Sequence, residues 1–192
     1  RSKRVGGAAQ LSSIQHEALK YKVFEFADSY EQQQKQEIRS EKENTQRGIF
    51  SGSSVRDSIL INHNSGTIDG EVLKFARDIQ GGSYQTRYYR IDTCRNFLFL
   101  KKTRDDIFPD TGLHLMELDN VRRWTYHSPY HKVTVLTMKV LPDTQSTFKG
   151  NLRAIGTTTQ YFFRTPNYQT DDHDFNLLFD VLKAYETAVT SA

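Results

Sequence analysis

The residues best suited to chemistry in this sequence are cations, and they gather in one window of the chain. Between Lys74 and Arg104 there are eight basic and two acidic residues, a net charge of +6, whereas the whole chain carries +3. Lysine and arginine suit phosphate groups, because both donate charge-assisted hydrogen bonds to phosphate oxygens. The candidate phosphate-binding residues are Lys74, Arg77, Arg87, Lys101, Lys102 and Arg104.

Patterns typical of catalysis or metal binding are weak. His127 and His131 are four positions apart, but Pro129 between them prevents an unbroken helix that would present both as ligands. Cys94 is the single cysteine and has no histidine near it in sequence, which favours an incidental thiol over a nucleophile. Neither of the common glycine-rich nucleotide-binding motifs occurs. We therefore expect no enzymatic activity, no metal site and no cofactor.

Three runs rich in β-branched and aromatic residues are expected to position the cations. They cover 68–76, 84–91 and 97–102, divided by Gly81-Gly82 and by the polar stretch 92–96, which is typical of three antiparallel strands. Because side chains alternate between the faces of a strand, Lys74 and Arg87 would lie near the open end of a curled sheet, beside the glycines. The competing interpretation is that these cations are ordinary solvated surface residues.

The remaining pattern predicts more strands and then a helix. Strand-like runs cover 113–118, 121–126, 133–141, 152–155 and 160–164. The period then changes to that of an amphipathic helix, with Thr170 or Asp171 as its expected N-cap. We expect a β-barrel or sandwich of about seven antiparallel strands, capped by this C-terminal α-helix. The apolar face of the helix comprises Phe175, Leu178, Phe179, Leu182, Tyr185 and Val189.

The chain ahead of the first long strand divides into three parts. Residues 1–12 lack periodicity and should be loose, 13–46 form a helical extension, and 47–65 are a linker with a short strand near 58–61; the domain proper covers 66–192. The extension is amphipathic over 14–31, with a polar continuation expected to fray towards 42. Its stripe could dock on the domain, on a partner protein or on a membrane. The stripe consists of Leu19, Val23, Phe26 and Tyr30.

Two segments resemble the opening of a pleckstrin-homology domain. Gly70-Glu71-Val72-Leu73-Lys74, a loop, and Tyr84-Gln85-Thr86-Arg87-Tyr88-Tyr89 match its first two strands, and the likeness in layout covers 66–189. The resemblance implies a pleckstrin-homology fold in which Lys74 and Arg87 hold the phosphates of an inositol lipid. The middle cation of the family's second strand is Gln85 here, and Tyr84 stands at the usual tryptophan.

Within this class, the helix ahead of the domain makes the chain similar to the acylated pleckstrin-homology proteins of apicomplexans. That resemblance implies myristoyl and palmitoyl anchors upstream of Arg1, a place on the cytosolic face of microneme organelles, and binding of phosphatidic acid that promotes exocytosis. Gln85 fits this preference, since a phosphomonoester needs fewer ligands than a phosphoinositide, the other lipid considered. The inner-membrane-complex sub-compartment proteins are also similar, and they imply protein contacts without lipid.

Three classes of function follow from these observations. A membrane adaptor would bring its cations to an anionic phospholipid surface and insert Ile79 and Phe108. A protein-interaction module would use a sheet edge. Nucleic-acid binding ranks last, because the strand order of an RNA-recognition domain is absent, so no nucleic-acid partner is expected. No run approaches 18 apolar residues, so no transmembrane helix is predicted.

Overall fold

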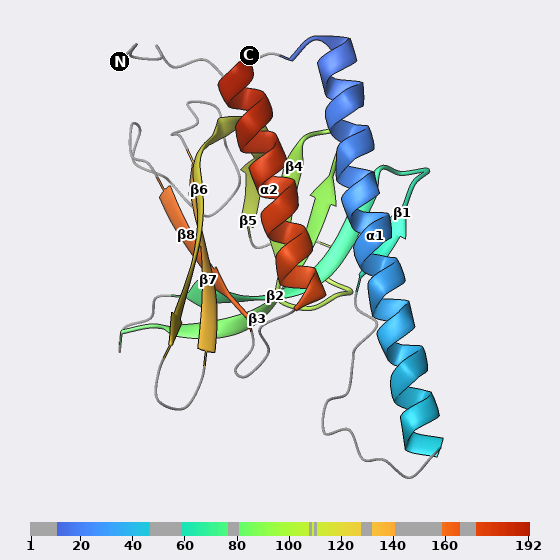
Figure 1. Cartoon of the computed structure of the whole chain (residues 1–192). Coiled ribbons are helices and arrows are strands. Elements are labelled where there is room, and N and C mark those ends of the chain that lie inside the picture. The colour runs from blue at the N-terminus through green and yellow to red at the C-terminus, as the bar shows by residue number, and fades with distance from the viewer. Residues whose placement is uncertain are drawn as a thin grey trace.

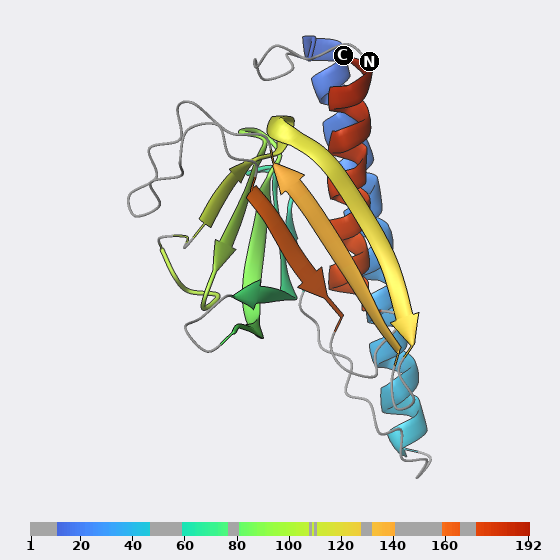
Figure 2. The ribbon, with the colours of Figure 1, turned by 90° about the vertical axis from the view of Figure 1, so that its left-hand side faces the viewer.

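The computed structural model describes residues 11–46, 59–76, 81–107, 109, 111–127, 132–140, 159–165 and 172–192. An antiparallel β-sheet has both long helices on one of its sides (Figures 1 and 2). The elements in chain order are α1 (Ser13–Gln46), β1 (Leu60–Asn62), β2 (Thr67–Ala76), β3 (Ser83–Asp92), β4 (Phe97–Lys101), β5 (Thr111–His114), the 3-10 turn η1 (Leu115–Glu117), β6 (Leu118–His127), β7 (Lys132–Val140), β8 (Thr159–Arg164) and α2 (His173–Ser191).

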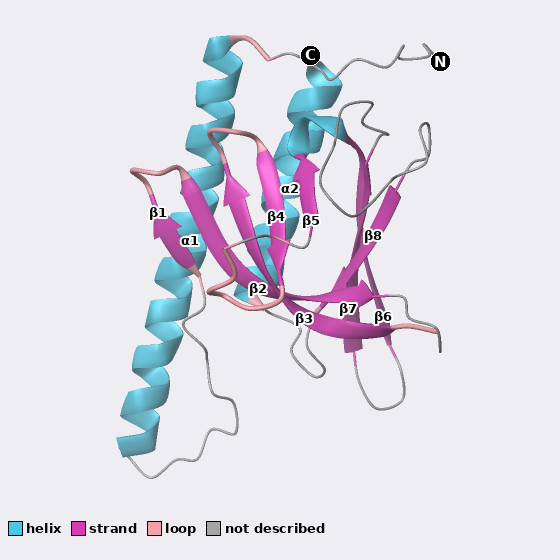
Figure 3. Ribbon diagram, turned by 180° about the vertical axis from the view of Figure 1, so that it is seen from behind, coloured by secondary structure: helices cyan, strands magenta, loops and turns pink. Residues whose placement is uncertain are grey.

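The sheet runs in the order β5-β4-β3-β2-β8-β7-β6, and β1 pairs with β2 off this path. Its two end strands, β5 and β6, are not paired with each other in the described part of the chain, so the sheet is open (Figure 3). β2 is shared by two neighbours: β1 pairs with its start, at Asp69, and β8 pairs with its end, at Leu73 and Lys74. The structure confirms an antiparallel sheet with a helix at each end of the chain.

The three predicted strands of the basic window are confirmed as β2, β3 and β4, within one residue at most of their bounds. The turn that follows β2 contains Gly81 and Gly82, whose φ angles of 130° and 111° favour glycine. A third glycine, Gly70, is required for space: a Cβ atom there would lie 2.3 Å from the Tyr89 hydroxyl oxygen. Tyr89 is the cross-strand partner of Gly70, so its ring lies across the bare backbone.

Two boundaries differ from the sequence prediction. The expected strand at 113–118 ends at His114, and a 3-10 turn with buried Leu115 and Met116 leads the chain into β6. An apolar run this short fits a buried turn as well as a strand, so periodicity does not separate the two. The short strand expected at 58–61 is β1, at Leu60–Asn62, while the strand expected at 152–155 lies outside the described residues.

Helix α2 covers one face of the sheet, called the inner face below. Its N-cap is Asp172, whose Oδ1 accepts a hydrogen bond from the Phe175 N–H at 2.8 Å. The predicted caps Thr170 and Asp171 were therefore wrong by one or two positions, because cap-forming residue types follow one another here. Five members of the predicted apolar face are buried and Phe179 is partly buried; the buried ones are Phe175, Leu178, Leu182, Tyr185 and Val189.

Helix α1 lies beside α2 and runs without a break to Gln46, beyond the predicted fraying (Figure 1). Leu19 and Val23 of the predicted stripe are buried, and Phe24 and Ala27 join them in the core. Burying an aliphatic or aromatic side chain contributes about 1.5 to 3 kcal/mol before conformational entropy is subtracted. Of the surfaces considered for this stripe, the structure places it on the chain's own domain.

Candidate functional site

The candidate site lies where β2 and β3 approach their shared turn. In the register of this pair Lys74 faces Gln85 and Val72 faces Arg87, so all four side chains share one face. That face is the inner one, because Tyr89, two residues beyond Arg87, is buried and donates its hydroxyl to the Asp174 carbonyl of α2 at 2.9 Å. Diagonal neighbours in such a pair are about 7 to 8 Å apart. The structure therefore brings Lys74 and Arg87 together on the inner face, as predicted.

Both cations contact neutral groups of the sheet. The Arg87 guanidinium donates to the Gln85 side-chain oxygen and to the Thr86 carbonyl, each at 2.8 Å. The Lys74 ammonium lies 5.4 Å from the centre of the Tyr161 ring on β8, within the range of a cation–π contact. Gln85 thus orients Arg87, and the sequence gives no sign of the contact with Tyr161 because β8 is far along the chain.

The other arginine of this part of β3 is neutralised. Arg90 points to the outer face, opposite to α2, and its guanidinium meets both carboxylate oxygens of Asp69 at 2.7 and 3.1 Å. The hydrogen bond with this carboxylate raises the pKa of Arg90, and two parallel bonds of this kind fix the geometry of both side chains. Arg90 is therefore held in an ion pair on the outer face, whereas Arg87 donates to the Gln85 and Thr86 oxygens on β3.

The cations at the end of β4 and in the turn after it do not join Lys74 and Arg87. Lys101 faces Tyr88 across the β3–β4 pair and so belongs to the outer face. It is buried, with 8% of its surface exposed, and its ammonium donates to the Arg104 carbonyl at 2.9 Å. Arg104 places its guanidinium 5.6 Å from the centre of the Tyr88 ring, and Lys102 is exposed in the same turn. Lys101 therefore stabilises this turn, while Arg104 contacts the ring of Tyr88.

The β2–β3 pair projects beyond the neighbouring strand. The described pairing of β3 with β4 begins at Tyr88, so residues 83–87 of β3 extend past the end of β4. Lys101 pairs with Tyr88 and Arg104 contacts the Tyr88 ring, so both lie on the opposite face from Lys74 and Arg87. Arg77, Ile79 and Phe108, the remaining predicted site residues, lie outside the described residues.

A buried acidic side chain connects this region to both helices. The Asp174 carboxylate, in the first turn of α2, is buried with 4% exposed. One of its oxygens accepts the Glu71 backbone N–H at 2.6 Å, and the other accepts the Gln34 amide of α1 at 3.3 Å. Asp174 therefore links α1, α2 and β2 three residues before Lys74, and no local sequence signal could have indicated the link to β2.

Three other kinds of feature could also carry a function: a metal site, a reactive thiol and a membrane-spanning helix. No group of three or more His, Cys, Asp or Glu side chains among them could hold a metal ion. Cys94 is an exposed free thiol in the turn between β3 and β4. None of the helices in the described ranges is long and apolar enough to cross a membrane. His131 and the side chain of His127 lie outside what the structure describes.

No family model matches this sequence, and no curated protein is significantly similar to it.

Proposed function

We propose that this chain is a non-enzymatic adaptor that binds anionic phospholipid at the cytosolic face of a membrane. The observation that supports it is the shared inner face of Lys74 and Arg87 beside the glycine turn. A headgroup phosphate lying between the two side chains would accept charge-assisted hydrogen bonds from both. Each cation close to an anionic leaflet contributes about 1 kcal/mol of attraction, so this pair would supply about 2 kcal/mol.

We also propose that the fold is pleckstrin-homology-like. Support comes from the strand order along the sheet and from the helix that follows the last strand and covers the inner face. In that fold the first two long strands and the loop between them carry the headgroup site, which corresponds here to β2, β3 and the turn at Gly81. β1 and α1 are then additions ahead of the domain.

Phosphatidic acid is the proposed headgroup. Gln85 is neutral and its side-chain oxygen already accepts from Arg87, so this face offers two cations near one another. Two cations suit a single phosphomonoester, whereas a phosphoinositide with several phosphates would need more. The proposed setting is the surface of a secretory organelle, where binding would promote regulated exocytosis, as the resemblance to the acylated pleckstrin-homology proteins implies.

The test is co-sedimentation with vesicles that contain phosphatidic acid, phosphatidylserine or phosphatidylinositol 4,5-bisphosphate at matched charge. We expect preference for phosphatidic acid, and a loss of about 30-fold in Lys74→Ala/Arg87→Ala, equivalent to about 2 kcal/mol. Arg39→Ala/Lys42→Ala is the control, because it removes the same charge from exposed positions on α1. Equal losses in both double variants, together with binding that salt abolishes, would mean a diffuse charge effect and no site.

A second candidate function is a protein-interaction module that binds no lipid. It is favoured by the contacts that Lys74 and Arg87 make inside the molecule, with Tyr161 and Gln85, since these give both cations a structural role. Absence of binding to all three vesicle types, with the fold intact by circular dichroism, would support this candidate over the first.

A further inference from the structure

A strand edge lies at β6, three strands along the sheet from β2, which carries Lys74. β6 ends the sheet, and within the described part of the chain it pairs with β7 alone. It is ten residues long, whereas β5 at the other end of the sheet has four. Unpaired edges present N–H and C=O groups that can bind another extended segment, and natural proteins usually cover or blunt them. β6 is therefore the longer of the two edges that need such cover.

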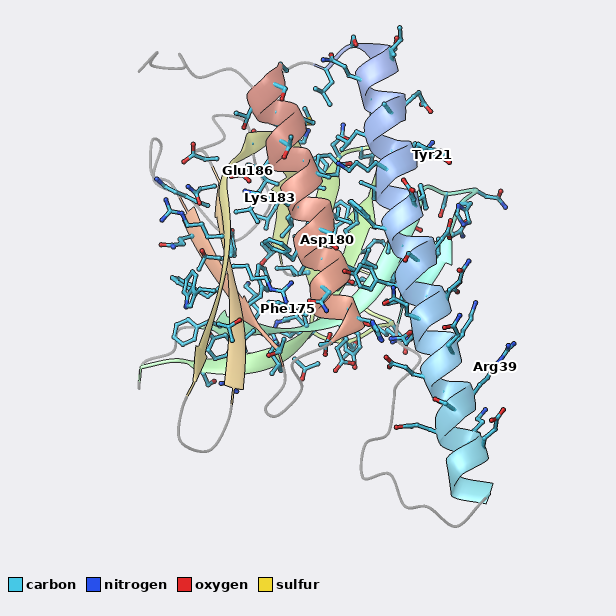
Figure 4. All side chains as sticks on the ribbon, in the orientation of Figure 1. Tyr21, Arg39, Phe175, Asp180, Lys183 and Glu186 are labelled. Carbon is cyan, nitrogen blue, oxygen red and sulfur yellow. The ribbon has the colours of Figure 1, made fainter. Side chains whose placement is uncertain are left out.

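Two side chains of α2 cover this edge at one residue. The Val121 N–H donates to Glu186 Oε1 at 3.0 Å, and the Val121 carbonyl accepts from the Lys183 ammonium at 3.3 Å. Lys183 and Glu186 also pair with each other, and Figure 4 places both on the β6 side of α2. Together they supply the donor and the acceptor that a neighbouring strand would supply, which shows that the Val121 backbone groups point away from β7.

The next residue with the same orientation is Arg123. Backbone groups of alternate residues point to the same edge, and the β6–β7 register is regular from Val121 to His127, so the Arg123 N–H and C=O also point away from β7. Its side chain lies towards α2, where the guanidinium is 5.7 Å from the ring centre of Phe175 and 5.4 Å from that of Phe179. Lys183 and Glu186 thus bind the edge-facing backbone groups of Val121, but they do not reach those of Arg123, two residues further along β6.

Exposed positive charge and an exposed aromatic ring surround this point. Residues 122–125 are all exposed, and Trp124 has 44% of its surface accessible. Among the residues that the structure describes, neither Arg122 nor Arg123 forms an ion pair. Because they are consecutive, the two arginines point to opposite faces of the strand and place charge on both sides of the edge. A ligand that matches this edge would be extended, so that its backbone could pair, and acidic.

We propose that the β6 edge around Arg123 binds an extended acidic segment of a partner protein as an added strand. The backbone of Arg123 pairs with that segment, and the guanidinium groups of Arg122 and Arg123 meet its carboxylates. Phe179, partly buried on α2, and Trp124 provide apolar contacts on the inner and outer sides. This surface is separate from Lys74 and Arg87 and does not depend on lipid binding.

The test starts from a phage-displayed library of random peptides of about ten residues, the length of a long strand, panned against the full 192-residue chain. The most enriched peptide, synthesised with a fluorescent label, is the probe for anisotropy. We expect enrichment in Asp and Glu, and affinity lower by about tenfold or more for Arg123→Glu, since a reversed charge opposes the acidic peptide. Arg39→Glu, with the same charge change on the exposed side of α1, should leave the affinity unchanged (Figure 4).

Strand addition is separated from simple charge attraction by the backbone. Arg123→Pro removes the edge N–H as well as the cation, so it should weaken binding more than Arg123→Ala does. Hydrogen exchange of the Arg123 amide in the unmodified chain should slow when the peptide is added, a readout that needs no variant. Lack of enrichment of acidic peptides, equal loss in Arg123→Glu and Arg39→Glu, or unchanged exchange at the Arg123 amide would each overturn the proposal. In those cases the arginines would act to keep other strands away from the edge.

Discussion

The carboxylate of Asp174 accepts the backbone N–H of Glu71 at 2.6 Å, so the first turn of α2 is fixed to the middle of β2. β2 carries Lys74 three residues later, and the second oxygen of Asp174 accepts the amide of Gln34 from α1. A single buried side chain therefore connects both helices to the strand that carries Lys74.

Asp174→Ala should destabilise the fold by about 3 kcal/mol, because it removes hydrogen bonds to a charged group and leaves a buried N–H without its acceptor. Tyr89→Phe is the smaller comparison: it removes one hydroxyl that donates to the Asp174 carbonyl and should cost about 1 kcal/mol. Urea unfolding followed by circular dichroism measures both. Equal effects of the two substitutions would contradict the central place given to the carboxylate.

Gly70→Ala should destabilise by about 1 to 3 kcal/mol, since its new methyl group would meet the Tyr89 side chain at the centre of the sheet. The cost should shrink when Tyr89 is also replaced by Ala, because the clash partner is then gone. Gly81→Ala is the contrasting case: nothing lies within 4 Å of the added atom, and only the positive φ opposes it. A double-mutant cycle in urea gives the coupling between residues 70 and 89.

Lys101→Met should lower stability by about 1 kcal/mol while leaving vesicle binding unchanged. The ammonium of Lys101 is buried and donates to the Arg104 carbonyl, so its loss weakens the turn after β4. Lys74→Met should have the opposite pattern, with weaker vesicle binding and little change in stability. Equal losses of vesicle binding in the two variants would mean that Lys101 also takes part in headgroup binding.

Tyr30→Phe should loosen α1. The Tyr30 hydroxyl donates to Asp180 of α2 at 2.7 Å, and burial together with this carboxylate raises the pKa of the phenol. Without the hydroxyl we expect a loss of about 1 kcal/mol and faster hydrogen exchange in α1. Tyr21→Phe is the matched control, because Tyr21 is 75% exposed and should tolerate the change (Figure 4).

The N-cap of α2 predicts a pH dependence. Burial raises the pKa of Asp172 above its ordinary value, so the folded state binds a proton there more readily than the unfolded state does. The contribution of Asp172 to the free energy of unfolding is then fully present below the pKa that Asp172 has in the unfolded state. It declines as the pH rises through the pKa of Asp172 in the folded state. Asp172→Asn keeps a good cap without a titrating group. The stability of the wild type relative to this variant should fall between pH 3 and pH 7, as urea unfolding at each pH would measure.

The sequence predicted the strands of the basic window closely, because alternation and glycine turns are local signals. The period of a strand also groups Lys74 with Val72, and Arg87 with Gln85 and Tyr89. The register of β2 with β3 is what puts the two groups on the same face. The sequence could not place Lys101, whose face depends on the register with β3, or show that Arg90 is paired with Asp69. The bounds 13–46 of the helical extension agree with α1, but the fraying expected in its polar half was wrong for a related reason. Gln34 and Glu37 look like solvated polar residues until their partners Asp174 and His173 are known.

The helix that begins the described chain is covered by the helix that ends it. Tyr30 and Asp180, which join them, are 150 positions apart. A ribosome that adds about 5 to 20 residues per second needs roughly 8 to 30 s to cover that distance. During this time the apolar residues of α1 have been made while α2, the helix that α1 contacts in the folded chain, has not. Newly synthesised α1 therefore has an exposed apolar face, which a chaperone or a membrane surface would cover until α2 has been synthesised.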